Sequence, residues 1–248
     1  MKGLIVAIQF LTRLPAPRIS VSGDEFAASM RWFPAVGLIV GALVAGAGWA
    51  GARIDPWTGA LAALILWVAV TGALHLDGLG DIADASGAAH KARGRLPADE
   101  ARGRLLAVLG DPHVGSFAVV AIALQLIAKL VLLHALLDRQ LFAAIALIPF
   151  AARIGPLAWS RALPDLHAGL GSRFRTAVRP ADFLIWGLTL IAAAWASPSL
   201  LIAPLVFFSW GWWLLHKIGG ISGDGHGAGI EIGETMLLGA AVLLAHLA

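Results

Sequence analysis

The 248-residue sequence contains no cysteine and no tyrosine, and charged residues make up only 13% of it. The absence of cysteine excludes disulfides, iron–sulfur clusters, thiolate metal sites and a cysteine nucleophile. The scarcity of charge, with 59% hydrophobic residues and a mean hydropathy of +0.82, excludes an ordinary soluble domain, in which about a quarter of residues are charged. Because the formal net charge is only +3 and no dense basic patch occurs, we expect no binding to nucleic acid.

Long apolar runs fill most of the chain, and a helix that spans the hydrocarbon core needs roughly 20 mostly apolar residues. Residues 1–11 are apolar but too short to span, so we expect residues 1–18 to form an interfacial segment. Tryptophans near the ends of the runs are typical of an aromatic belt. The sequence therefore predicts an all-α integral membrane protein, a single domain over residues 1–248 with six or seven transmembrane helices. The expected spans are 33–51, 58–74, 116–137, 141–159, 183–196, 200–216 and 233–248.

Two glycines four residues apart, Gly37 and Gly41, lie in the first expected span. Small residues at this spacing let two membrane helices approach closely. We therefore expect another helix to pack against this face.

Lysine and arginine are concentrated on one side of the expected topology, which by the positive-inside rule is the cytoplasmic side. The three long connections 77–115, 161–182 and 217–232 lie on this side, so we expect them to be cytoplasmic and to carry the function. The outer connections hold only Arg53 and Arg139. The inner basic residues are Lys2, Arg13, Arg18, Arg31, Lys91, Arg93, Arg95, Arg102, Arg104, Arg161, Arg173, Arg175, Arg179 and Lys217.

Three aspartates follow the second expected span, in His75-Leu-Asp77-Gly-Leu-Gly-Asp81-Ile-Ala-Asp84. Their spacing, i, i+4 and i+7, places the carboxylates on one face of a continuing helix. Such a stripe repels itself unless a cation lies between the groups, and Mg²⁺ binds one or two carboxylates together with substrate phosphate oxygens. The alternative is a solvated acidic helix end. His75 alone is more typical of a packing residue than of a ligand.

A glycine-rich segment, Lys217 to Gly227, precedes the last expected span. Glycine backbone lets N–H groups approach a phosphate closely. We expect Lys217, Gly219, Gly220 and Ser222 to bind substrate there, with Asp224 as a further metal ligand. The alternative is a flexible loop between two helices.

Two cations, Lys129 and Arg153, fall inside expected spans. An ionisable group at that depth costs about 2.5–3.5 kcal/mol, so it should face the bundle interior and meet an anion. That anion is either a substrate phosphate or a buried carboxylate. Glu231 and Glu234 lie near the start of the last expected span, where they either complement the helix dipole or, in the case of Glu234, form a buried acid.

Polar residues also open the third expected span, in Asp111-Pro-His113-Val-Gly115-Ser116. We expect Ser116 to cap this helix, and Asp111 and His113 to face the same site as the carboxylates. These groups together suit metal-assisted phosphoryl or nucleotidyl transfer at the membrane. Two other classes fit the residues. One is a CDP-alcohol-type membrane phosphotransferase, whose signature of Asp-Gly with a following Ala-Arg is missing here, and the other is a transporter of an anionic or cationic small molecule.

At these residues the sequence resembles the cobalamin synthase family, the adenosylcobinamide-GDP ribazoletransferases, over essentially the whole chain. Three places depart from the family pattern: Gly110 and His113 stand where basic residues are usual, Ala85 stands where a glycine is usual, and Gly225-His226-Gly227 replaces a less glycine-rich run. The matching motifs are Phe10-Leu-Thr-Arg13-Leu-Pro15-Ala-Pro17, the aspartate segment from His75 to Ala85, the pair Ala128-Lys129, and Gly219-Gly220-Ile-Ser222-Gly223-Asp224 with Glu231 and Glu234.

The resemblance implies a Mg²⁺-dependent transferase of a bacterial inner membrane, with its active site facing the cytoplasm. It would join adenosylcobinamide-GDP to α-ribazole or its 5′-phosphate and release GMP. Asp77, Asp81, Asp84 and Asp224 would bind metal, and Arg13, Asp111 and His113 would join the glycine segment in binding substrate. Lys129 would act in catalysis, and one of His75, Asp84 or Glu234 would take the hydroxyl proton. The oligomeric state stays open, a homo-oligomer included.

Overall fold

The computed structural model describes residues 2–92, 97–166 and 170–247. No strand occurs in these ranges, where one isolated parallel bridge joins Asp165 to Ile221, so the all-α prediction is confirmed. The helices are α1 (Lys2–Leu11), α2 (Gly23–Ser29), η1 (Met30–Trp32), α3 (Phe33–Gly51), α4 (Pro56–Thr71), α5 (Leu74–Ala92), α6 (Ala98–Leu109), α7 (Ser116–Asp138), α8 (Phe142–Ala152), α9 (Gly155–Ala162), α10 (Leu170–Ala177), α11 (Pro180–Ala194), η2 (Pro198–Ile202), α12 (Ala203–Lys217) and α13 (Gly223–Leu247).

Several helices are long and apolar enough to cross a membrane. A broken sixth span arises if α4 and α5, which meet at an angle of 84°, are counted together, and the apolar α11 is shorter than the others. The five long segments, the broken span and α11 together correspond to the seven apolar runs that the sequence predicts. The five long segments within the described residues are Gly23–Gly51, Ser116–Asp138, Phe142–Ala162, Pro198–Lys217 and Gly223–Leu247.

The bend between α4 and α5 is made by two residues in the left-handed region. Gly72 has φ of 60° and Ala73 has φ of 59°, a conformation that ends one helix before the next begins. The expected span 58–74 therefore stops at the bend, and α5 leaves it in a new direction.

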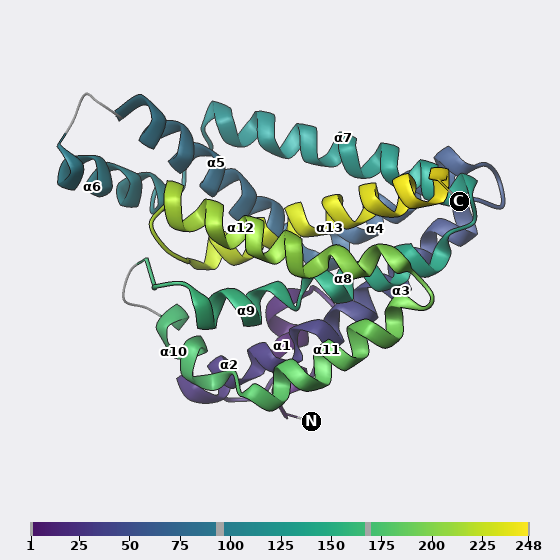
Figure 1. The fold of residues 1–248 in the computed structure, drawn as a ribbon, viewed down its shortest axis with the longest axis horizontal. Coiled ribbons are helices and arrows are strands. Elements are labelled where there is room, and N and C mark those ends of the chain that lie inside the picture. The colour runs from purple at the N-terminus through teal and green to yellow at the C-terminus, as the bar shows by residue number, and fades with distance from the viewer. Residues whose placement is uncertain (1, 93–96, 167–169, 248) are drawn as a thin grey trace.

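The spanning helices run side by side along the long axis of the molecule (Figure 1). The connection between α3 and α4 and that between α7 and α8 lie at one end, and α6 and α10 lie toward the other (Figure 1). Arg53 lines a cavity with Asp138 and Gln140 at the first end. The side chains of Lys91, Arg93, Arg95 and Arg173 lie outside the described residues.

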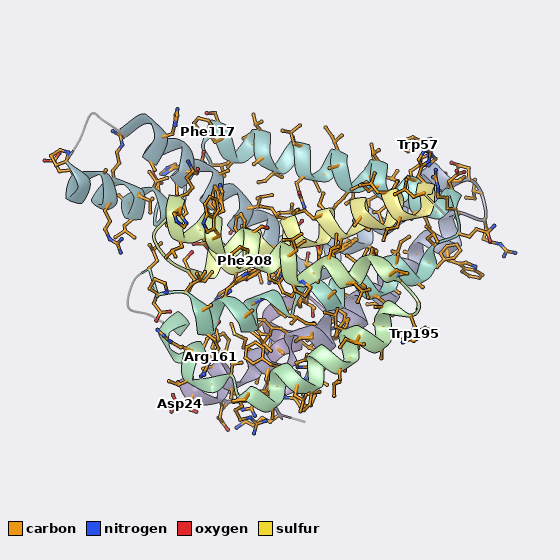
Figure 2. All side chains as sticks on the ribbon, in the orientation of Figure 1. Asp24, Trp57, Phe117, Arg161, Trp195 and Phe208 are labelled. Carbon is orange, nitrogen blue, oxygen red and sulfur yellow. The ribbon has the colours of Figure 1, made fainter. Side chains whose placement is uncertain are left out.

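Large apolar side chains cover the outer faces of the long helices. Leu124 in α7 is 62% exposed and Phe208 in α12 is 71% exposed, which is what contact with lipid requires. Trp57 and Trp195 lie near the end that carries the α3–α4 connection (Figure 2) and are both exposed, as an aromatic belt requires. The chain is a multi-pass membrane protein.

The close approach expected at Gly37 and Gly41 occurs between α3 and α8. A Cβ atom at Gly41 would overlap the carbonyl oxygen of Ala146, and one at Gly37 would overlap that of Pro149. The two helix backbones therefore touch along this face, as small residues at this spacing predict.

The last helix begins at Gly223 rather than at residue 233, so the prediction of a long loop before it is wrong. The Ser222 hydroxyl accepts a hydrogen bond of 3.0 Å from the N–H of Gly225 and caps the helix. Glycine weakens a helix in water, but here it allows contact, since a Cβ atom at Gly229 would overlap Trp210 and Trp159. Most of the expected connection 77–115 is likewise helical, as α5 and α6.

Candidate active site

The three aspartates of α5 lie on one helix, as their spacing predicts, and Asp224 joins them from α13. The helices touch at Gly78, where a Cβ atom would come within 2.9 Å of the carbonyl oxygen of Asp224. The Asp81 carboxylate is close enough to Asp224, Asp77 and Asp84 to be repelled by each of them. We call these four residues the carboxylate cluster. It gathers negative charge at the start of α13.

Asp84 also has a structural task that its sequence position does not reveal. Its Oδ2 accepts a hydrogen bond of 2.7 Å from the N–H of Gly115, and its Oδ1 accepts one of 3.1 Å from the N–H of Ala118. These N–H groups belong to the first turn of α7 and have no partner within that helix. The prediction that Ser116 caps α7 is therefore wrong, because Gly115 is the N-cap residue and a carboxylate from α5 takes that role.

The donor chemistry of the carboxylate cluster suits a hard divalent cation. In the part of the chain that the structure describes, no three histidine, cysteine, aspartate or glutamate side chains are close enough together to hold a metal ion by themselves. Mg²⁺ does not need such a cage, because it usually takes one or two carboxylates and completes its shell with waters and phosphate oxygens. The cluster thus fits a metal that arrives with a phosphorylated substrate.

The glycine segment is less free to bind phosphate than predicted. The N–H of Gly219 donates to the carbonyl oxygen of Leu214, and the N–H of Ile221 donates to that of Pro164, both at 2.9 Å. The Ser222 hydroxyl caps α13. These groups hold the segment between α12 and α13 in place, and Gly220 packs against the backbone of Pro164.

Arg13, an expected substrate ligand, lies at the bend between α4 and α5. The N–H of Arg13 donates to the carbonyl oxygen of Val70 at 2.7 Å, and its side chain lies across Gly72, where a Cβ atom would overlap it. Arg13 is exposed. It therefore stands at the bend from which α5 begins, about one turn before Asp77.

Asp111 and His113 lie in the exposed connection between α6 and α7. The Nδ1 atom of His113 is 2.6 Å from Oδ1 of Asp111, and the backbone N–H of His113 donates to the same oxygen at 3.0 Å. These two hydrogen bonds, the backbone one first, hold the pKa of the Asp111 carboxyl below its usual range. Because Gly115 is bound to Asp84, this connection runs beside the carboxylate cluster.

The remaining charged residues form a separate group in the interior, which we call the buried ion cluster. Lys129 lies 2.7 Å from Glu231 and 2.5 Å from Glu234, and Arg153 lies 2.8 Å from the other oxygen of Glu234. All four side chains are at most 4% exposed. The anions that meet Lys129 and Arg153 are thus carboxylates of α13, and Glu234 has a cation on each oxygen.

Two side chains that contact the buried ion cluster, Gln125 and Trp67, were not predicted from the sequence. The amide of Gln125 donates to a carboxylate oxygen of Glu231 at 2.9 Å and to the hydroxyl of Thr235 at 2.7 Å. The Lys129 ammonium lies 4.3 Å from the centre of the Trp67 ring, within range of a cation–π contact. Gln125 stands four residues before Lys129, so it shares a helix face with it, and that spacing is the signal that could have found it.

His75 belongs with the buried ion cluster rather than with the carboxylates. It is 2% exposed, its Nδ1 atom is 3.5 Å from Arg153, and its backbone packs against Gly227 of α13. Its role as a proton acceptor, and that of Glu234, stay predictions, but both side chains lie away from water. Of the three expected acceptors, Asp84 alone lies in the carboxylate cluster.

The chain matches one protein family, described as Cobalamin-5-phosphate synthase, over residues 3–242. A protein of Novosphingobium aromaticivorans named adenosylcobinamide-GDP ribazoletransferase is 62% identical over 242 residues, covering 96% of this chain and 95% of its own length. Proteins of the same name from Thiobacillus denitrificans and Brevibacillus brevis are 48% and 32% identical, covering 99% and 96% of this chain and 95% and 96% of their own lengths. No solved structure matches the chain.

Proposed function

The chain belongs to the cobalamin-5-phosphate synthase family, and we propose that the carboxylate cluster is the active site of its reaction. The enzyme is an adenosylcobinamide-GDP ribazoletransferase, which acts in assembly of the nucleotide loop of cobalamin. It joins adenosylcobinamide-GDP to α-ribazole or its 5′-phosphate and releases GMP.

The reaction exchanges one phosphorus–oxygen bond for another. A ribose hydroxyl oxygen of α-ribazole bonds to the phosphorus that carries cobinamide, and the bond from that phosphorus to the GMP oxygen breaks. The hydroxyl proton passes to a base, and negative charge develops on the departing GMP. The protein must therefore hold a diphosphate, orient a hydroxyl and stabilise the leaving group.

One or two of the carboxylates of Asp77, Asp81 and Asp224 are the proposed ligands of Mg²⁺, together with phosphate oxygens of the substrate. The mutual repulsion at Asp81 supports this assignment, because a cation among like charges relieves it. When bound, Mg²⁺ would neutralise charge on the diphosphate and on the leaving GMP. Asp84 is the weakest candidate ligand, since both of its oxygens already accept hydrogen bonds from α7.

Other groups near the cluster would hold and orient the substrates. The first turn of α13 carries the partial positive charge of a helix N-terminus, and Arg13 stands at the bend before Asp77. Both favour phosphate oxygens beside the carboxylates. Asp111 and His113 are exposed and remain proposed contacts of the nucleotide. The exposed Lys217, which was predicted to bind substrate, lines a separate cavity between α5 and α12 instead. Asp84 is the proposed acceptor of the hydroxyl proton because of the three expected acceptors it alone lies in the carboxylate cluster.

We place the enzyme in a bacterial inner membrane with the carboxylate cluster facing the cytoplasm. The excess of lysine and arginine on the side of α6 and α12–α13 supports this orientation. The water-soluble substrates would then reach the cluster from the cytoplasm. The transferase names of the relatives favour this enzyme over a carrier or a CDP-alcohol phosphotransferase.

One assay tests the proposal. The purified full chain in detergent is incubated with adenosylcobinamide-GDP, α-ribazole 5′-phosphate and Mg²⁺, and GMP and the corrinoid product are measured by chromatography. We expect equal amounts of both products and none after chelation of divalent metal. Release of GMP without a corrinoid product, or undiminished turnover in chelator, would refute the proposed site chemistry.

A further inference from the structure

A large cavity lies on the far side of α5 from the carboxylate cluster. Its volume is about 1070 Å³. One wall is α5 with the start of α7, the other wall is α12, and α13 contributes Ile232 and Met236. We call it the lateral groove. Its lining includes Leu79, Ile82, Ser86, His90, Phe117, Val206, Ser209, Trp210, Trp212, Trp213, His216 and Lys217.

The lateral groove is not part of the proposed active site. At 3.6 residues per turn, Leu79, Ser86 and His90 lie on the opposite side of α5 from Asp77 and Asp81. The groove residues and the cluster residues share no member. A ligand in the groove is therefore separated from the carboxylates by the body of the helix.

The polarity of the groove changes along its length. Val206, Ile232 and Met236 line the part deepest along α12 and α13, whereas His90, His216 and Lys217 line the end where α12 stops. From Val206 to Lys217 the helix rises about 16 Å. That length is close to half of the roughly 30 Å hydrocarbon core, so the groove is long enough to extend across one leaflet.

The walls of the groove face the lipid side of the molecule. Ser209, Trp212, His216 and Lys217 are exposed, and they adjoin Phe208, which is 71% exposed on the outer face of α12. Phe117 at the start of α7 and Phe208 on α12 are both labelled in Figure 2. The Trp212 ring packs on the His216 ring at 4.5 Å, which places an amphipathic aromatic group at the basic end.

We propose that the lateral groove binds one anionic phospholipid from the leaflet at the Lys217 end. Its phosphate would lie against Lys217 and His90, and one acyl chain would extend along Val206 and Met236. The charge at the mouth complements an anionic headgroup, and the length and apolar depth match a chain. The site is distinct from the substrate site, and only its assignment to the cytoplasmic leaflet rests on the proposed orientation.

The occupant would act on the enzyme through α5, whose two faces carry the groove and the carboxylates. A chain lodged between α5 and α12 fills space that would otherwise let α12 close in. We therefore expect bound lipid to raise the thermal stability of the purified chain.

The first test measures bound lipid directly, independently of turnover. Purified full chain, stripped in detergent, is mixed with phosphatidylglycerol or with phosphatidylcholine, and retained lipid is counted by native mass spectrometry. We expect one tightly retained phosphatidylglycerol and at least tenfold weaker retention of phosphatidylcholine. Equal retention of both lipids, or no discrete bound lipid, would overturn the proposal.

Two variants locate the site. Ser209→Trp fills the groove and should abolish the retained lipid. Leu215→Trp, at an exposed position on another face of the same helix that does not line the groove, should not. His90→Glu changes an exposed group at the mouth and should lower retention of phosphatidylglycerol about tenfold even if Ser209→Trp fails to fold. Retention equal to wild type in folded Ser209→Trp and in His90→Glu would refute the assignment.

A competition experiment tests whether the substrate, rather than a lipid, occupies the lateral groove. Adenosylcobinamide-GDP should leave the retained phosphatidylglycerol in place. Displacement of the lipid by this substrate would show that the groove belongs to the substrate site. The transferase assay on the same preparation is independent, so an inactive chain that still retains phosphatidylglycerol would contradict the proposed function alone.

Discussion

The carboxylate of Asp84 in α5 holds the backbone of Gly115 at the start of α7, with 2.7 Å between Oδ2 and the amide nitrogen. The same carboxylate binds the N–H of Ala118 through its other oxygen. The sequence spacing assigns Asp84 to a metal site, but in the structure its carboxylate also joins α5 to α7.

Replacing Asp84 should therefore lower stability as well as activity. Asp84→Ala removes both acceptors from the first turn of α7, and loss of such a cap costs about 1–2 kcal/mol. Asp84→Asn keeps one acceptor oxygen and should lose less. Thermal unfolding in detergent should rank wild type above Asn above Ala; three identical midpoints would contradict the capping role.

Replacing Asp77 should affect metal binding without affecting stability, because no hydrogen bond to α7 within the described residues depends on it. Asp77→Asn removes a repelling carboxylate and a proposed metal ligand, so the protein should fold and insert normally. The activation barrier should rise by several kcal/mol, so nearly all turnover should be lost, and the remaining activity should depend less on Mg²⁺. A titration of activity with Mg²⁺ checks this, and near-normal activity with an unchanged Mg²⁺ requirement would remove Asp77 from the metal site.

The buried ion cluster should be sensitive to the loss of one charge. Lys129→Met leaves Glu231 and Glu234 with only Arg153, and breaking a buried pair in this way costs about 3–5 kcal/mol. The yield of folded protein in the membrane should fall. Adding Glu231→Gln should restore part of it, because the pair of Arg153 and Glu234 is then balanced.

The opposite result has a clear meaning. If Lys129→Met accumulates at wild-type levels and loses its turnover, Lys129 meets the substrate rather than only the carboxylates. The measurements are the folded yield after size-exclusion chromatography and the specific activity of the recovered protein.

The contact between α3 and α8 offers a matched pair of glycines. Gly41→Ala places a methyl group against the carbonyl of Ala146 and should cost about 1–3 kcal/mol. Gly46→Ala, in the same helix, meets nothing within 4 Å and should be neutral or stabilise by up to about 1 kcal/mol. Unfolding midpoints check both, and equal effects would contradict the close contact.

The orientation can be tested by labelling, because the chain has no native cysteine. Cysteines at His113 and Lys217 should react with a membrane-impermeant maleimide from the cytoplasmic side only. A cysteine at Arg139, at the other end, should react from outside. Labelling of His113 and Lys217 from opposite sides would exclude a single catalytic face.

The sequence predicted most of the spans because lipid imposes one simple demand, a continuous apolar run. It failed at α13, where glycines that reduce hydropathy and helix propensity are used for contact with Trp159 and Trp210. Ser222 followed by Asp224 is a helix-start signal, but a glycine-rich stretch favoured a loop. Only the packing of α13 against Trp159 and Trp210 shows that this segment is a helix rather than a loop.

The candidate site was predictable only as far as one helix extends. The spacing of Asp77, Asp81 and Asp84 correctly put them on one helix, since that depends on local geometry. The approach of Asp224, the hydrogen bonds of Asp84 to α7 and the choice of Glu231 and Glu234 as partners of Lys129 depend on how helices pack. No spacing within one segment determines those.

The buried ion cluster can be completed only late in synthesis, because its members are far apart in the chain. Lys129 and its partner Glu234 are 105 residues apart in the chain, so at roughly 5–20 residues per second the lysine waits about 5–20 s for its carboxylates. Held alone in lipid, that cation costs about 2.5–3.5 kcal/mol. Synthesis therefore passes through a stage in which α7 is charged and unmatched, and arrival of α13 completes the assembly. A chain that ends before Glu231 lacks both carboxylates that meet Lys129, so the last helix completes the charge balance of the bundle.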